Sequence, residues 1–172
     1  AWSSAASLST ARVYAGSNGT QNATLIYGNY PNTVNGAATE EYNGTGFSTG
    51  GDLNTARRSM GGAGTQTAGL AIAGYDGTNT NKTEEYDGSS WTEVTVYPAS
   101  GHNICGFGTQ TAAVACGKAN APKKLTNEYD GTSWTSGGDL NTDRSHSEGA
   151  GTQTAGLTFT GDPAFGSGAS AT

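Results

Sequence analysis

The sequence predicts an all-β protein built from about four tandem copies of one short unit. Three observations favour this fold: a turn-rich composition, a recurring tripeptide and an alternation of large and small side chains. Glycine provides 28 of the 172 residues, whereas charged residues make up 13% and hydrophobic residues 33%. Because glycine and asparagine accept the positive φ angles of tight turns, this composition is typical of short strands joined by hairpins.

The repeat is defined by the tripeptide Gly-Thr-Gln, which begins at Gly19, Gly64, Gly108 and Gly151. Its spacing of 43–45 residues predicts a single repeat domain over residues 1–172. A unit of this length cannot bury its own faces, so neighbouring units are expected to stack on one another. The units are approximately 2–46, 47–90, 91–133 and 134–172, the last being incomplete.

Each unit is expected to contain four short strands. In the second unit the first two strands cover residues 58–63 and 66–75, the third covers 83–86, and an Asp-Gly turn leads into the fourth. Large residues lie two apart on every second strand, which is the period of a strand with one bulky face. These pairs are Leu25 and Tyr27, Leu70 and Ile72, Val114 and Cys116, and Leu157 and Phe159.

Aromatic residues mark the third and fourth strands. A tyrosine follows a glutamate at the end of the third strand, and a second aromatic residue lies five positions later. We expect these side chains to form the repeated core. The row of large residues on one unit, the bulky row, should pack against the row of small residues on the next unit, the smooth row. They are Tyr42, Tyr86 and Tyr129, and then Phe47, Trp91 and Trp134, with Trp2 as an earlier member of the second series.

The spacing of Ala73-Gly74, Tyr86 and Trp91 resembles the Kelch repeat, which is marked by a double glycine followed by a separated tyrosine and tryptophan. The double glycine is incomplete in every copy of this chain. The segments TEEYDGSSWT, GGDLNTARR and GAGTQTAGLA are similar to Gly/Thr-rich Kelch-like arrays in structural and tail-associated proteins of bacteriophages, especially marine ones. The resemblance implies a β-propeller of about four blades, each with four antiparallel strands.

The two ends of the chain bear on whether such a propeller closes. The fourth unit has no Glu-Tyr strand, whereas Trp2 belongs to an extra fourth strand at the start of the chain. One interpretation is that the N-terminal strand completes the last blade and closes a four-bladed ring. The alternatives are that the chain is one slice of a longer array, or that subunits add strands to one another in a fibre.

Recurring arginines are the first candidates for a binding site. Arg12, Arg57 and Arg144 occupy matching positions near the innermost strand, and the third copy has Gly101 there. Guanidinium groups that line a central channel could bind an anion or an acidic glycan. The alternative is that they form hydrogen bonds to carbonyl groups or to the recurring glutamates between blades.

Other polar residues have a simple structural explanation beside a functional one. Asn18, Asn22, Asn43 and Asn81 begin Asn-x-Thr sequences, which are glycosylation acceptors in a secretory route but also suit tight turns. We expect Asn81 in the loop between the second and third strands. His102 and His146 have no sequence partners that suggest a metal set or a catalytic triad. We therefore expect both histidines to be polar residues of the inner strand or of its loop.

Cys105 and Cys116 are expected on the first and second strands of one hairpin. If that hairpin turns at Gly108-Thr109, Cys105 faces Ala112, and a disulfide would need an irregular pairing. Cys116 also fits the bulky row as a small hydrophobic residue.

The leading functional hypothesis is a non-catalytic structural or adhesive module of a phage-like virion, without a cofactor. Its expected partners are other subunits, including copies of itself, and cell-surface glycans. The formal charge of −6 with eight basic residues disfavours nucleic acid, and no apolar run approaches the roughly 20 residues that span a bilayer. The alternative is a secreted, possibly glycosylated protein of an extracellular filament or surface layer. A third hypothesis, a Kelch-type copper oxidase, would need Tyr, His and Cys ligands that converge.

Overall fold

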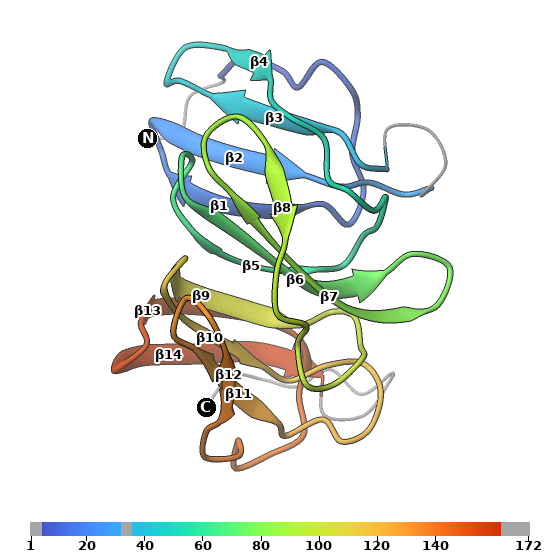
Figure 1. The fold of residues 1–172 in the computed structure, drawn as a ribbon, viewed down its shortest axis with the longest axis vertical. Helices are drawn as coiled ribbons and strands as arrows, with labels where there is room; N and C mark the ends of the chain where they lie inside the picture. Colours follow the sequence, from blue (N-terminus) through green and yellow to red (C-terminus); the bar gives the residue numbers. More distant parts are fainter. Residues whose placement is uncertain (1–4, 32–35, 163–172) are drawn as a thin grey trace.

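A computed structural model describes residues 5–31 and 36–162. It confirms the all-β prediction, because these residues form four antiparallel sheets and contain no helix. They therefore include no helix long and apolar enough to cross a membrane. The sheets follow one another along the chain, and we number them blades 1 to 4 (Figure 1).

Within the described residues, three blades have four strands in simple meander order, and the fourth has two. Blade 1 consists of β1 (Gly16–Thr20), β2 (Ala23–Tyr27), β3 (Thr39–Tyr42) and β4 (Phe47–Thr49). Blade 2 consists of β5 (Gly61–Gly64), β6 (Gly69–Tyr75), β7 (Asn79–Tyr86) and β8 (Trp91–Glu93). Blade 3 consists of β9 (Cys105–Thr109), β10 (Ala112–Cys116), β11 (Thr126–Tyr129) and β12 (Trp134–Ser136). Blade 4 consists of β13 (Ser145–Thr152) and β14 (Ala155–Asp162).

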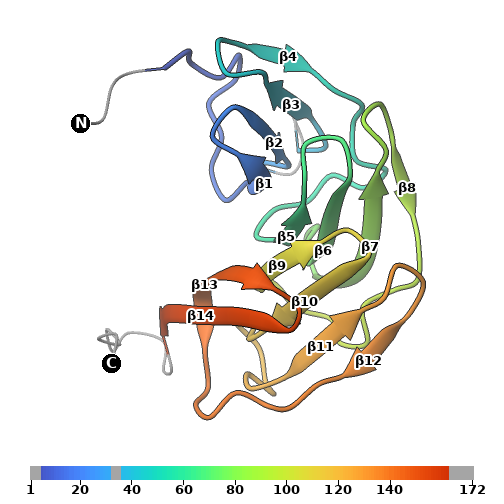
Figure 2. The same ribbon diagram turned by 90° about the vertical axis from the view of Figure 1, so that its left-hand side faces the viewer.

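The blades stand side by side along an arc, with the first strand of each blade on its inner side (Figure 2). β1 packs against β5, β5 against β9, and β9 against β13. β1 and β13 lie at the two ends of the arc, so the described residues do not form a closed ring (Figure 2). Trp2, which was expected to close the last blade, lies outside the described residues.

In blades 1 to 3 the face with the large residues packs on the face with the small residues of the blade that follows. Leu25 and Tyr27 are fully buried, and Leu25 lies directly over Gly69 of blade 2. Phe107 of blade 3 similarly covers Gly156 of blade 4, where a Cβ atom would lie 2.1 Å from the ring. The glycines of the smooth row are therefore required by the close approach of the preceding blade rather than by turn geometry.

The hairpin of β9 and β10 places the two cysteines differently from the sequence-based expectation. The turn lies at residues 110 and 111, and the register pairs Thr109 with Ala112 and Cys105 with Cys116. The expectation that Cys105 faces Ala112 was wrong because it placed the turn two residues too early. Both thiols are buried and free, and they lie between blades 3 and 4, where Thr158 contacts Cys105.

Candidate functional site

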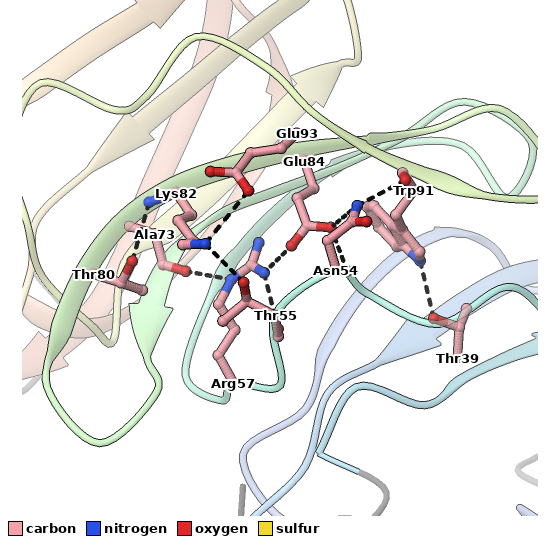
Figure 3. Close-up of polar contacts among 10 residues, drawn as sticks. All are labelled: Thr39, Asn54, Thr55, Arg57, Ala73, Thr80, Lys82, Glu84, Trp91 and Glu93. Atoms are coloured by element: carbon pink, nitrogen blue, oxygen red, sulfur yellow. Dashed lines mark hydrogen bonds and ion pairs between the residues drawn. The ribbon is translucent and has the colours of Figure 1, made fainter.

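The recurring arginines lie inside the blades and hold strands together. Arg57 and Glu84 form an ion pair in which both side chains are fully buried. Arg57 also donates from Nε to the carbonyl of Ala73 at 2.9 Å, while Asn54 donates to the other carboxylate oxygen of Glu84 from its backbone and side-chain nitrogens (Figure 3). This network joins the loop before β5 to β6 and β7.

Blade 1 repeats the same arrangement. Arg12 bonds to Glu40 at 2.8 Å and to the carbonyl groups of Gly28 and Ala38. Burial raises the pKa of the Glu40 carboxyl, but hydrogen bonds from the Ser9 amide and from Arg12 outweigh burial, and the pKa lies below its usual range. Glu40 therefore stays ionised at neutral pH and balances the charge of Arg12.

The third copy loses both members of this pair together. Gly101 stands at the arginine position, and Asn127 on β11 stands where blade 2 has Glu84. Lys118 extends into the space beside Gly101 and donates to the carbonyl of Ser100 at 3.2 Å. The paired change supports a structural role for the arginine, since a charge without its partner would be costly to bury.

Arg144 of blade 4 keeps the arginine but has no third strand beside it within residues 36–162. It donates to the carbonyl of Thr160, at the position that corresponds to Ala73. The Arg12 and Arg57 side chains are buried and donate to carboxylate and carbonyl groups of their own blades. The anion site that the sequence suggested therefore cannot use these two arginines.

The four Asn-x-Thr asparagines lie in different settings. Asn22 is exposed in the β1–β2 turn, and Asn43 is exposed in a turn where its Oδ1 accepts hydrogen bonds from Thr45 and Gly46. Asn18 lies on β1 and donates from Nδ2 to the carbonyl of Thr65 at 2.7 Å. The expectation that Asn81 lies in a loop was wrong, because β7 begins earlier than predicted and includes this residue.

A glutamine clamp joins each blade to the one before it, which explains the third residue of Gly-Thr-Gln. Gln110 of blade 3 donates to the carbonyl groups of Gly69 and Tyr86 on β6 and β7 of blade 2. Gln66 and Gln153 make the equivalent hydrogen bonds to blades 1 and 3. The tripeptide thus combines a glycine with positive φ and a side chain that reaches the preceding blade.

A tyrosine–glutamate hydrogen bond also connects adjacent blades, and we call each contact between adjacent blades a joint. The Tyr86 hydroxyl donates to Glu41 of blade 1 at 2.5 Å, and Tyr129 donates to Glu85 of blade 2 at 2.9 Å. Burial and the hydrogen bond to Glu41 raise the pKa of Tyr86 to about 12, so the hydroxyl stays protonated as a donor. Each joint therefore contains an apolar row, a glutamine clamp and, at two of them, this hydrogen bond.

The repeated core residues show where the series of joints stops. Tyr86, Tyr129, Leu70 and Ile72 are fully buried, Trp91 is buried, and Tyr42, Phe47 and Trp134 are partly buried. Leu157 and Phe159, expected in the core, are instead 65% and 40% exposed. The reason is that no further blade covers the outer face of β14 within the described residues.

Blade 1, at the opposite end of the arc, has a glutamine and a tyrosine at the positions that contact the preceding blade elsewhere. Gln21 of blade 1 is exposed and makes no hydrogen bond like those of the other three glutamines within the described residues. Tyr42 donates to the carbonyl of Gly44 in its own turn rather than to a preceding glutamate. The two end faces of the arc, with Leu157 and Phe159 on one and Gln21 and Tyr42 on the other, form the candidate functional site.

The described residues define an all-β protein of four consecutive antiparallel sheets. No protein-family model matches this chain, and no curated protein sequence is significantly similar to it. The described residues contain no group of three or more His, Cys, Asp or Glu side chains placed to hold a metal ion.

Proposed function

We propose that this protein is a structural module that assembles head to tail with copies of itself. The observation that carries the proposal is the apolar face of β14, where Leu157 and Phe159 are exposed at the positions that are buried in every other blade. Exposed large side chains in a contiguous row mark interaction surfaces. β14 also pairs only with β13 among the described strands, so it presents an open edge.

A second copy of the chain is the partner that this face fits. Blade 1 of that copy offers the exposed glutamine Gln21 and the tyrosine Tyr42, whose hydroxyl bonds only to its own turn among the described residues. The corresponding face of blade 1 carries Ser17, Thr24 and Ile26 where blade 2 has Gly62, Gly69 and Ala71. Because these side chains are larger than glycine, a joint between copies is weaker than one within a chain, and assembly depends on concentration.

The Kelch-like propeller and the setting of this assembly remain parts of the proposal. The resemblance to bacteriophage arrays supports a setting in a virion, as a tail, fibre or capsid-decorating protein. An extracellular filament or surface layer is the alternative setting. Both use rigid blades and repeated contacts between subunits, and neither needs a catalytic centre.

The assembly is tested by replacing both exposed apolar residues, Leu157→Asp with Phe159→Asp. The wild-type chain of 17.3 kDa is expected to form oligomers whose mass rises with concentration, because the end faces join copies. The double variant is expected to stay monomeric, because carboxylates on the face lose solvation on docking. Light scattering after size-exclusion chromatography measures both masses.

Val96→Asp serves as the matched control, since Val96 is also a large exposed apolar residue but lies outside the end faces. It should assemble like the wild type. Unchanged thermal unfolding of the double variant excludes loss of fold. A wild-type chain that stays monomeric up to millimolar concentration, or a double variant that still assembles, would overturn the proposal.

A further inference from the structure

Four residues at matching positions form a connected row at the start of the inner strands. Tyr14, Ser59, Asn103 and His146 all have positive φ angles, which is uncommon for residues other than glycine. Backbone hydrogen bonds join them in series, from the Ser59 amide to the Tyr14 carbonyl, from Asn103 to Ser59 and from His146 to Asn103. Such conformations persist where the surrounding structure enforces them and often mark functional sites.

A cavity of about 410 Å³ opens at this row, and we call it the mouth pocket. Two of its aromatic residues, Tyr14 and Tyr30, are 58% and 50% exposed. The volume suits a small ligand. The lining residues are Tyr14, Tyr30, Arg58, Ser59, His102, Asn103 and His146.

The side chains of this pocket depart from the repeat. The residue before each member of the row is Val13, Arg58, His102 or Ser145, and no two of these are alike. By contrast, the glutamine of Gly-Thr-Gln is present in all four units. A residue that supports the blades should recur in every unit. The four different residues at this position therefore indicate a role that is performed in one unit only.

Arg58 is the main charged group of the pocket. Its guanidinium carbon lies 4.3 Å from the ring centre of Tyr30 and 4.8 Å from that of Tyr75. Stacking on aromatic faces leaves the N–H donors at the guanidinium edge available. Among the described residues, no carbonyl or carboxylate accepts a hydrogen bond from this side chain, in contrast to Arg12 and Arg57.

The remaining polar groups favour an anion with hydroxyl groups. Among the described residues no acidic side chain lines the mouth pocket, although the whole chain has a net charge of −6. Glu148 lines two adjoining cavities. His102 donates from Nδ1 to Oδ1 of Asn79 at 2.6 Å, which leaves Nε2 as an acceptor. Burial lowers the pKa of His102, and His146 and Arg58 lower it further, so Arg58 carries the positive charge at neutral pH.

We propose that the mouth pocket binds a saccharide that carries a carboxylate. The planar guanidinium of Arg58 matches a carboxylate in two parallel hydrogen bonds. The exposed rings of Tyr14 and Tyr30 offer flat apolar surfaces to the C–H face of a sugar, and Asn103, Ser59 and His102 provide partners for its hydroxyl groups. The site does not depend on the end faces, so it stands or falls separately from the assembly.

The test is an amide NMR titration of the full chain with methyl glucuronide, methyl glucoside and inorganic sulfate. Methyl glucuronide is expected to bind in the millimolar range and to shift the amides around Tyr14, Arg58 and Asn103. Arg58→Gln should weaken this binding about 10-fold or more, because charge-assisted hydrogen bonds are lost. Tyr14→Ala should weaken glucuronide binding but leave sulfate binding unchanged.

Arg144→Gln is the matched control, because Arg144 is a partly exposed arginine outside the mouth pocket. It should bind like the wild type, and unchanged spectra elsewhere in the Arg58 variant show that its fold is retained. Sulfate that binds as tightly as methyl glucuronide would overturn the requirement for a saccharide. Methyl glucoside that binds as tightly as methyl glucuronide would overturn the requirement for a carboxylate. Absence of saturable binding, or binding unaffected by Arg58→Gln, would overturn the site.

Discussion

Glu84→Gln is expected to lower the free energy of unfolding by about 3–5 kcal/mol, the usual cost of removing one partner from a buried ion pair. Glutamine keeps the shape of the side chain but removes its charge. The Arg57 guanidinium then stays buried without a counter-ion, because both side chains are fully inaccessible to solvent. For a domain whose total stability is about 5–15 kcal/mol, this loss is large. Urea unfolding followed by tryptophan fluorescence measures it.

Glu93→Gln is the matched control for this prediction. Glu93 makes an ion pair with Lys82 at 3.4 Å on the same blade, but the Glu93 side chain is 45% exposed. An exposed pair contributes roughly 0–1 kcal/mol, so the same substitution should cost less than about 1 kcal/mol here. Equal effects at the two glutamates would show that Arg57 reaches solvent and that the buried pair is not a central support of blade 2.

Gly106→Ala is expected to lower the free energy of unfolding by about 2–3 kcal/mol, near the upper end of the cost of overpacking. A Cβ atom at this position of β9 would lie 2.7 Å from the amide nitrogen and 2.8 Å from the carbonyl oxygen of Gly62 on β5. The obstruction is backbone rather than a flexible side chain. It can be relieved only by separating blades 2 and 3, which also weakens the apolar packing between them.

The comparison variant is Gly138→Ala, at an exposed position where an added Cβ meets nothing within 4 Å and φ is not in the positive region. There, alanine should leave stability unchanged or raise it by up to about 1 kcal/mol, because it restricts the unfolded chain. Gly106→Ala should therefore destabilise the protein, whereas Gly138→Ala should not. Urea unfolding of both variants provides the test, and a Gly106→Ala variant as stable as the wild type would contradict the close approach of β5 and β9.

Sequence reasoning found the strands of blade 2 because their signals are local, but it misplaced some bounds. β5 covers Gly61–Gly64 rather than 58–63, and β7 begins at Asn79 rather than at residue 83. The two-residue alternation around Leu70 and Ile72 and the Asp87-Gly88 turn depend on neighbouring residues only. The spacing of Gly-Thr-Gln likewise predicted the order of the units. It did not explain Gln66 or Gln110, because the acceptors of a clamp lie 24 to 42 residues away in the preceding blade.

The candidate sites were much harder to predict. Arg57 and Arg58 are adjacent in sequence, yet Arg57 is fully buried against Glu84 while Arg58 lines the mouth pocket. The recurrence of arginine in the repeat drew attention to Arg57, which has a structural role. The proposed pocket is instead marked by a position at which the repeat units differ, the position of Arg58 and His102.

The sequence by itself therefore determined the class of fold, the number of units and the alternation of bulky and smooth faces. These features follow from backbone geometry and side-chain period, which act over a few residues. Only the tertiary structure decided the register that pairs Cys105 with Cys116, the exposure of Leu157 and Phe159, and the course of the blades along an open arc. Those outcomes depend on which surfaces meet, and contacts between blades join residues that are far apart in the chain.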